Sequence, residues 1–200
     1  MKALTLLKRF SAGLAIATLA VTANAAPVDV FAQANSWGLE GGPRIGAITG
    51  LILLPGNQFS VSVPSDDLWS SGPLPRWSNA AGLTGPLLAT AGDDSGETAG
   101  TVIGADHGLY STDGLSAAYG SLVGQIGTAA PFLIGLGGVF TAANAGALSL
   151  FYWDSNSGDN TEYVTAEVNP VPLPAAAWLL LSGVAAVGAL ARRRRALAAA

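Results

Sequence analysis

The stretch Phe59-Ser60-Val61-Ser62-Val63 decides the fold, because apolar side chains alternate with hydroxyls over five residues. Strict alternation puts the apolar residues on one face of an extended strand and the polar residues on the other. An apolar run, 45–54, precedes this strand, and the turn residues Pro55-Gly56-Asn57 separate the two. The pattern predicts two half-buried strands joined by a turn.

The same kind of pattern continues along the chain on both sides of this pair. No segment between residues 26 and 169 shows sustained helical spacing of apolar residues, and Gly, Pro, Asn and Ser interrupt the apolar runs. About seven short strands with frequent turns are typical of a sandwich or barrel. We therefore predict one all-β domain over 26–169, a β-sandwich of the jelly-roll or galactose-binding-like kind. Four further predicted strands are 121–126, 132–136, 147–153 and 163–168.

The composition excludes several classes of site. The 200 residues are 50% hydrophobic and 11% charged, with no cysteine and a single histidine, His107. Without cysteine there is no disulfide scaffold, thiolate metal site or cysteine nucleophile. One histidine cannot build a multi-histidine metal centre.

The first 25 residues read as a secretory signal peptide. Lys2, Lys8 and Arg9 make a basic start, an apolar run follows over 10–21, and Ala23-Asn24-Ala25 matches a cleavage site. We expect signal peptidase to cut after Ala25.

The other end reads as a membrane anchor. An uncharged apolar stretch over about 175–191 is just long enough to span a bilayer as a helix. Four consecutive arginines, Arg192, Arg193, Arg194 and Arg195, then hold that end in the cytoplasm, and a short tail, 196–200, follows.

Residues 170–195 as a whole resemble a known sorting signal. The Pro motif Val171-Pro172-Leu173-Pro174-Ala175, the apolar stretch and the arginine cluster are similar to the VPLPA-CTERM type of the PEP-CTERM class. The resemblance implies an exported protein of a Gram-negative bacterium, anchored in the cytoplasmic membrane. An exosortase would cut near the Pro motif, and the protein would then reach the cell surface or extracellular matrix.

Between these two ends the chain is strongly acidic. Residues 26–169 hold all thirteen acidic residues and only two bases, Arg44 and Arg76, which gives a formal charge of −11. Nucleic-acid binding is excluded, since phosphate contact needs a basic face. An acidic exported domain without disulfides suggests Ca²⁺, which prefers oxygen ligands.

The best candidate for a Ca²⁺ site is the polar segment Asp154-Ser155-Asn156-Ser157-Gly158-Asp159-Asn160-Thr161. It follows the strongest predicted strand, Leu148-Ser149-Leu150-Phe151-Tyr152-Trp153. Its carboxylates, amides and carbonyls could converge on one cation. The same residue types also make an ordinary hydrophilic turn, and residue pattern alone leaves both interpretations open.

A second resemblance favours the cation. Three segments line up in order with the LecA-like family of calcium-dependent galactophilic bacterial lectins: Trp69-Ser70-Ser71-Gly72-Pro73-Leu74-Pro75-Arg76-Trp77, Gly120-Ser121-Leu122-Val123-Gly124-Gln125-Ile126-Gly127 and Ala145-Gly146-Ala147-Leu148-Ser149-Leu150. By this resemblance, Asp154, Asp159 and Asn160 supply side-chain ligands. Backbone oxygens come from Ser71 and from Ser155 or Asn156, and sugar hydroxyls complete the calcium shell.

The sequence departs from that family around the sugar. The loop between Asp154 and Asp159 is shorter than its counterpart, and His107 is followed by Gly108 where a His-Pro contact is expected. Trp77 and His107 remain weak candidates for contacts with a glycan or exopolysaccharide. The alternative function is a structural matrix (biofilm) protein without a specific ligand. A hydrolase is disfavoured, because no Gly-x-Ser-x-Gly elbow is present, and we expect no enzymatic activity.

Overall fold

The computed structural model describes residues 26–38, 43–172, 184 and 188. The signal peptide 1–25, Leu173, Pro174, Ala175 and Arg192 to Arg195 lie outside the described residues, as does the 175–191 segment apart from Val184 and Gly188. Among the described residues, no helix is long and apolar enough to span a bilayer.

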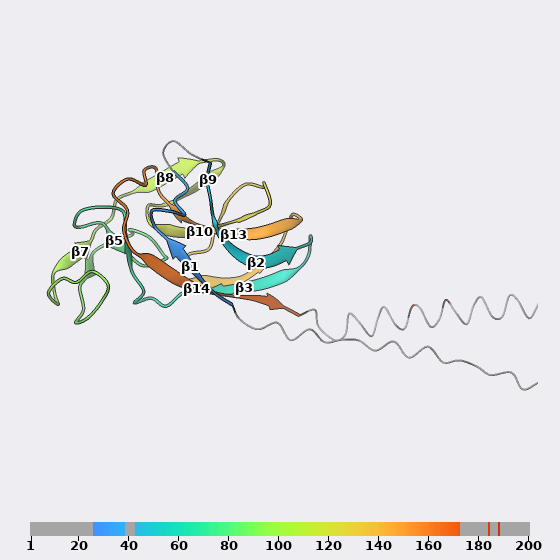
Figure 1. Cartoon of the computed structure of the whole chain (residues 1–200), viewed down its shortest axis with the longest axis horizontal. Coiled ribbons are helices and arrows are strands. Elements are labelled where there is room, and N and C mark those ends of the chain that lie inside the picture. The colour runs from blue at the N-terminus through green and yellow to red at the C-terminus, as the bar shows by residue number, and fades with distance from the viewer. Residues whose placement is uncertain (1–25, 39–42, 173–183, 185–187, 189–200) are drawn as a thin grey trace, which may run out of the picture.

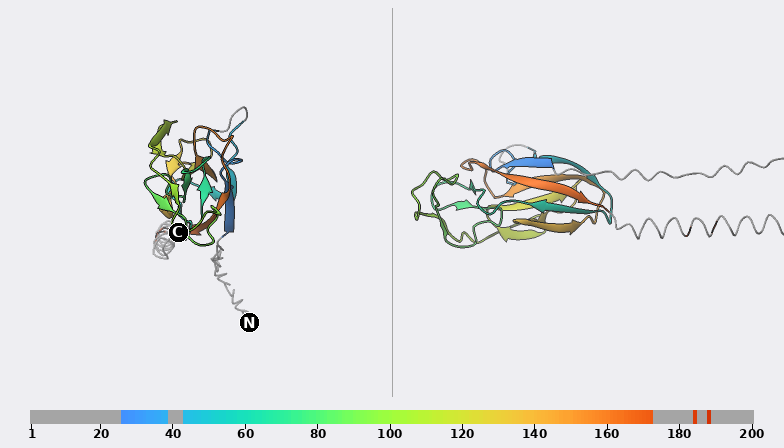
Figure 2. Two further views of the ribbon diagram at one scale, coloured as in Figure 1. Left: turned by 90° about the vertical axis from the view of Figure 1, so that its left-hand side faces the viewer. Right: turned by 90° about the horizontal axis from the view of Figure 1, so that it is seen from below.

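The domain consists of two four-stranded antiparallel sheets packed face to face (Figures 1 and 2). The first sheet has the order β1 (Ala26–Phe31), β14 (Tyr163–Val171), β3 (Gln58–Ser62), β12 (Gly137–Thr141). The second has the order β11 (Phe132–Leu133), β10 (Ser121–Ile126), β13 (Gly146–Trp153), β2 (Ala47–Leu53). The all-β prediction is confirmed.

The alternating residues of β3 lie on opposite faces of the strand, as predicted. Phe59 and Val61 are buried between the sheets, whereas Ser62 points to solvent. Across the sandwich they share one apolar core with Leu148 and Leu150 of β13. All six predicted strands are present, although the strand predicted over 132–136 is only two residues long.

Two strands of the sandwich were not predicted, β1 and β12. β1 begins directly after the predicted cleavage site, and Gly137 and Gly138 open β12. Glycine has no side chain to pack and weakens a strand. The two glycines therefore hide the alternation of apolar and polar residues that would predict β12.

Three two-stranded hairpins lie outside the main sheets. The hairpin of β8 and β9 covers the outer face of β13, where Trp37, Phe151 and Trp153 form a second buried cluster. β13 is therefore apolar on both faces. The hairpin strands are β4 (Trp69–Ser70), β5 (Trp77–Ser78), β6 (Leu87–Leu88), β7 (Val102–Gly104), β8 (Leu109–Thr112) and β9 (Leu115–Ala118).

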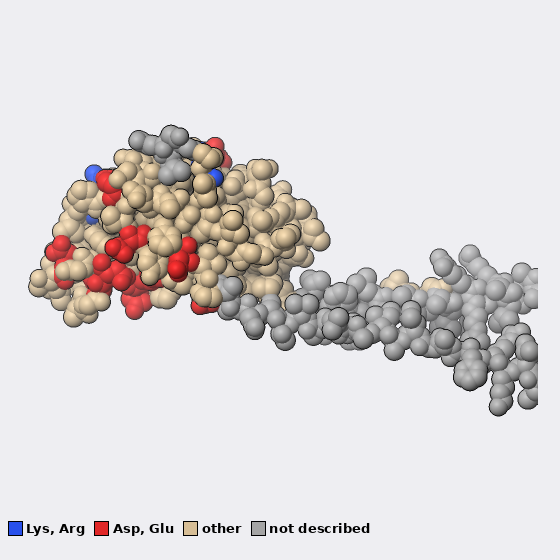
Figure 3. All heavy atoms as spheres, viewed as in Figure 1, with Lys and Arg blue, Asp and Glu red and all other residues tan. Residues whose placement is uncertain are grey.

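The described chain enters and leaves the sandwich at the same end. β1 pairs antiparallel with β14, with Ala26 opposite Val168 (Figure 1). β14 continues past the expected domain boundary at Asn169 to Val171, which pairs with Gln58. On the face that Figure 3 shows, most of the acidic side chains lie toward the opposite end of the molecule.

Candidate functional site

Backbone pairing brings two distant segments together at the acidic end. Ser70 of β4 and Thr161 exchange two hydrogen bonds, each 3.0 Å between nitrogen and oxygen. This pairing places Ser71, the residue after β4, beside the end of the 154–161 loop. Trp69, the first residue of β4, holds this strand against the core. Its Nε1 donates to the Gly120 carbonyl at 2.9 Å, and its ring packs edge-on against Tyr152.

Asp154 is a buried carboxylate at the end of β13. The residue is only 5% exposed, and its Oδ1 accepts backbone N–H bonds from Ser155 (2.6 Å) and Asn156 (3.4 Å). Burial raises the pKa of Asp154 above its ordinary value, although these hydrogen bonds oppose the shift, and the negative charge of Asp159 raises it further. Burial thus disfavours the ionised form of Asp154 despite its hydrogen bonds.

Asn160 presents an acceptor with no donor. The residue is 2% exposed, and its Nδ2 donates to the Ala32 carbonyl at 3.1 Å. Its Oδ1 has no hydrogen-bond partner among the described residues. A buried amide oxygen without a partner costs about 1–3 kcal/mol, so a water or an ion is expected to satisfy it.

Two further buried oxygens beside this site, Ser71 Oγ and the Tyr152 hydroxyl, lie close to each other and have no hydrogen-bond partner of good geometry among the described residues. Burial raises the pKa of Tyr152 well above its ordinary value, and the charge of Asp154 adds to that shift. Of the four such buried atoms among the described residues, three thus lie at or beside the predicted Ca²⁺ site; the fourth is Ser36 Oγ.

Asp159 is the exposed member of the set. Its Oδ2 lies 3.5 Å from a guanidinium nitrogen of Arg76, and both side chains are about two-fifths exposed. The backbone of Gly72 approaches the same carboxylate so closely that a Cβ there would overlap Oδ2. The arrangement joins Asp159 to the turn that follows Ser71.

Asn156 is oriented differently from the other predicted ligands. Its side-chain Oδ1 accepts the Gly158 N–H at 2.8 Å, which closes a local turn, and the residue is exposed. Only its backbone carbonyl remains as a possible donor to a cation, as the resemblance implies. On the other side of the loop, Gly38 packs against the Asp154 and Ser155 backbone, with no room for a Cβ.

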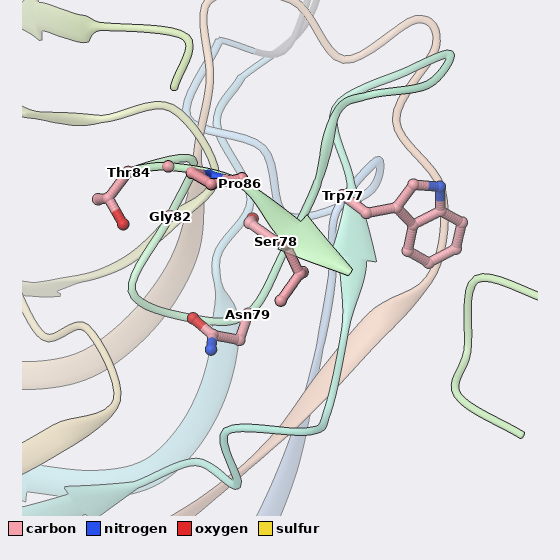
Figure 4. A pocket seen from close by; sticks show the side chains of 8 residues that line it. Trp77, Ser78, Asn79, Gly82, Thr84 and Pro86 are labelled. Carbon is pink, nitrogen blue, oxygen red and sulfur yellow. The ribbon is translucent and has the colours of Figure 1, made fainter. Parts of the chain in front are cut away.

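The two weak candidates for sugar contacts do not join this set. His107 is exposed, and its ring packs edge-on against Tyr119 with 5.2 Å between centroids. Trp77 lies on β5, where it packs partly buried against a small apolar cluster. It also lines a shallow hollow of about 120 Å³ with Asn79 and Thr84, but its indole points away from both side chains (Figure 4).

The site offers oxygen ligands and little else. Among the described residues, no three His, Cys, Asp or Glu side chains gather closely enough to hold a metal by themselves. A cation here would need the Asn160 amide oxygen and backbone carbonyls besides Asp154 and Asp159. That mixture suits Ca²⁺, which takes six to eight oxygens in flexible geometry, better than it suits Zn²⁺.

The sequence did not reveal the contributions of Tyr152, Gly38 and Arg76. Tyr152 reads as a core residue of a strand, and the other two become neighbours of the loop only through long-range pairing. A pattern of residues in one segment carries no signal for such contacts.

The comparisons with known proteins identify no family. No protein-family model matches the chain, and no curated protein matches it. Among solved structures, one described as "EclA N-terminal domain; PllA-like lectin" is similar, with a TM-score of 0.43 and 18% sequence identity. The match covers 74% of this chain and 95% of that chain. The roles of individual residues therefore rest on the geometry of this chain.

Proposed function

We propose that this chain is an exported surface protein whose β-sandwich binds Ca²⁺ at the 154–161 loop and takes a carbohydrate through that ion. The observation that carries the proposal is the buried Asp154 carboxylate beside the unpartnered Oδ1 of Asn160. A divalent cation would neutralise the first and satisfy the second.

The ligand set is drawn from both segments that meet at the site. Asp154, Asp159 and Asn160 supply side-chain oxygens, and the backbone of Ser71 and of Ser155 or Asn156 supplies carbonyls. Bound Ca²⁺ would offer its remaining coordination positions to water or to a pair of sugar hydroxyls. The chain's own part is to hold these oxygens in place and to exclude bulk water from the buried side.

Arg76 sets a limit on the affinity of the site. Its guanidinium already contacts Asp159, so a cation must compete with this positive charge for the carboxylate. Because both side chains are partly exposed, the ion pair is weak, and Ca²⁺ can displace it.

The proposal includes export and anchoring by the two chain ends. β1 begins at Ala26, the first residue after the predicted cleavage site, so the mature N-terminus would enter the sheet at once. β14 ends at Val171, directly before Pro172, so a cut after that strand would leave both sheets intact. Signal peptidase and an exosortase are the implied partners.

Sugar retention tests the binding function. We expect the full chain in detergent to be retained on beads carrying galactose, glucose, mannose or fucose in millimolar Ca²⁺, and to elute with a chelator. The Asp154→Asn variant should not be retained, whereas Asp106→Asn, which changes an exposed carboxylate in another loop, should behave as the parent does.

The other outcomes of that test are equally informative. Retention that survives chelation would contradict a sugar bound through Ca²⁺. A chain that takes up Ca²⁺ without saturation and binds none of the four sugars would instead be the structural matrix protein.

A further inference from the structure

The end of the sandwich from which the chain leaves, here called the exit end, carries no charge. It consists of three turns, 54–57, 127–130 and 141–145, and the strand end at 170–171. The turns lie together, because the Gly56 N–H donates to the Ala142 carbonyl and the Gly127 N–H to the Ala147 carbonyl. The segments that supply these turns, 45–65 and 114–153, contain no Asp, Glu, Lys or Arg, and on β14 the nearest charged residue is Glu167, four residues before Val171.

Aliphatic side chains are exposed at this end. Leu54 is 62% exposed in its turn, and Ile52 is 77% exposed on the edge strand β2. An apolar hollow of about 290 Å³ also opens among the turns, with Phe59, Phe132 and Phe140 in its lining. Exposed apolar groups gathered in one uncharged region mark a surface that another apolar phase covers.

The short segment between β14 and the predicted membrane span indicates that the apolar phase is the lipid bilayer. The apolar stretch predicted to span the membrane begins at Ala175, four residues after the end of β14 at Val171. Four residues span at most about 14 Å when fully extended. The headgroup layer on each side of a bilayer is itself about 5–8 Å thick. An anchored domain therefore cannot stand clear of the lipid surface.

The charge distribution favours the same orientation. Asp154 follows the eight-residue strand β13, so it lies roughly 25 Å from the exit end along that strand. This distance exceeds the screening length of about 8 Å at physiological ionic strength. Repulsion between the acidic end and anionic lipids would thus be screened, whereas the reverse orientation would press the carboxylates onto them.

We propose that, in the anchored form, the exit end rests on the lipid bilayer with Leu54 in the headgroup layer, and that the Asp154 loop faces away from the membrane. The inference rests on the proposed membrane anchor and not on Ca²⁺ binding. It gives the polarity of the domain a function, because the ligand site is presented to the outside before the chain is released.

Spin labels can test this directly, since the chain has no cysteine of its own. We would reconstitute the full chain into vesicles of phosphatidylethanolamine and phosphatidylglycerol, with a nitroxide on Leu54→Cys or on Leu88→Cys. Leu88 is a matched control, 53% exposed on β6 outside the exit end. We expect collisions with a water-soluble nickel chelate to be at least threefold rarer at position 54, and collisions with oxygen to be more frequent there.

The outcomes separate the inference from the anchor on which it rests. If the labelled chain floats with the vesicles but positions 54 and 88 are equally accessible to the nickel chelate, the docking is overturned and the membrane anchor is not. A chain that does not float would overturn both. Dipolar broadening between labels at position 54 would show a second copy covering the exit end, which would also overturn the docking.

Discussion

At the scale of single residues, Asp154 is the most informative side chain of the site. A carboxylate in a mostly buried position stays there only if something compensates its charge, and the backbone donors of Ser155 and Asn156 do so in part. The raised pKa of Asp154 shows that the compensation is incomplete. The isosteric substitution Asp154→Asn would keep an acceptor for these donors and remove the charge, so it separates the two contributions.

The pH dependence of stability follows from that shift. Because the pKa of Asp154 is higher in the folded chain than in the unfolded chain, folding favours the protonated form. The stabilisation by the neutral form is therefore fully present only below about pH 4, the ordinary range of the carboxyl pKa, and is lost as the pH rises through the raised pKa. In chelator, we expect Asp154→Asn to melt above the parent at pH 7 and level with it at pH 4, measured by circular dichroism. Equal melting temperatures at both pH values would contradict a strained carboxylate.

Arg76 should weaken Ca²⁺ binding, whereas the ligands strengthen it. Replacing it by Gln removes the positive charge 3.5 Å from Asp159 and leaves the backbone carbonyl that holds Ser71. We expect Arg76→Gln to tighten Ca²⁺ binding about two- to fivefold, measured by calorimetry, since exposed charge pairs contribute roughly 0.2–1 kcal/mol. Arg44→Gln is the matched control, because Arg44 pairs with Asp113 and should leave the affinity unchanged. Unchanged affinity in Arg76→Gln would place Asp159 outside the site.

Gly38 tests whether the loop backbone is held in place from outside. A Cβ at this position would overlap the Asp154 and Ser155 backbone, which cannot yield as a flexible side chain would. We expect Gly38→Ala to weaken Ca²⁺ binding at least tenfold, whereas Gly85→Ala, where a Cβ meets open space, should bind as the parent does. Unchanged affinity in Gly38→Ala would show that the loop adjusts freely.

At the scale of elements, β13 joins the core to the site. Its inward residues pack between the sheets, its outward residues pack beneath the β8–β9 hairpin, and the candidate ligands follow its end. The hairpin is tied down at its tip, where Asp113 accepts a 2.9 Å hydrogen bond from Trp37 Nε1 and pairs with Arg44 at 2.7 Å. The Trp37 hydrogen bond, with help from the charge of Arg44, lowers the pKa of Asp113.

Trp37 is the residue on which this outer layer depends. It is 1% exposed and packs against both Phe151 and Trp153. We expect Trp37→Ala to lower the free energy of unfolding by about 3–5 kcal/mol, as truncation of a buried aromatic residue does, measured by urea denaturation. A loss below about 1 kcal/mol would mean that the hairpin contributes little to the fold.

The sequence predicts the elements of the inner sandwich better than those outside it. Phe59 and Val61 alternate with serines, so β3 could be predicted from its period alone, and the paired strands β10 and β13 are mostly apolar. The β8–β9 hairpin could not be predicted from the sequence. Every residue of β8 is partly or fully exposed, so this strand has no buried face. Likewise Asp154 and Asn160 could be predicted as neighbours of one loop, but Tyr152 and Gly38 enter the site only through tertiary packing.

At the scale of the whole molecule, the domain is polarised between its acidic end and its exit end (Figure 3). Both described chain ends leave from the uncharged side, next to each other on β1 and β14. The ligand site is thus as far from the proposed anchor as the length of the strands allows.

Both proposed cleavages, after Ala25 and near the Pro motif, should fall outside the strands of the two sheets. We expect N-terminal sequencing of the exported protein to begin at Ala26, and the intact mass of the released form to lack Arg192 to Arg195. A start at Met1 would contradict the signal peptide. A released form that ends before Val168 would lose the pairing of β14 with Ala26 and β3, and would contradict a cut at the Pro motif.

Calorimetric titration of the full chain with CaCl₂ in detergent at pH 7 tests the central claim most directly. We predict one saturable site per chain, lost or weakened at least tenfold in Asp154→Asn and unchanged in Asp106→Asn. If the parent chain takes up no Ca²⁺, or if Asp154→Asn binds it as tightly as the parent does, then the 154–161 loop is a polar turn and not a calcium site.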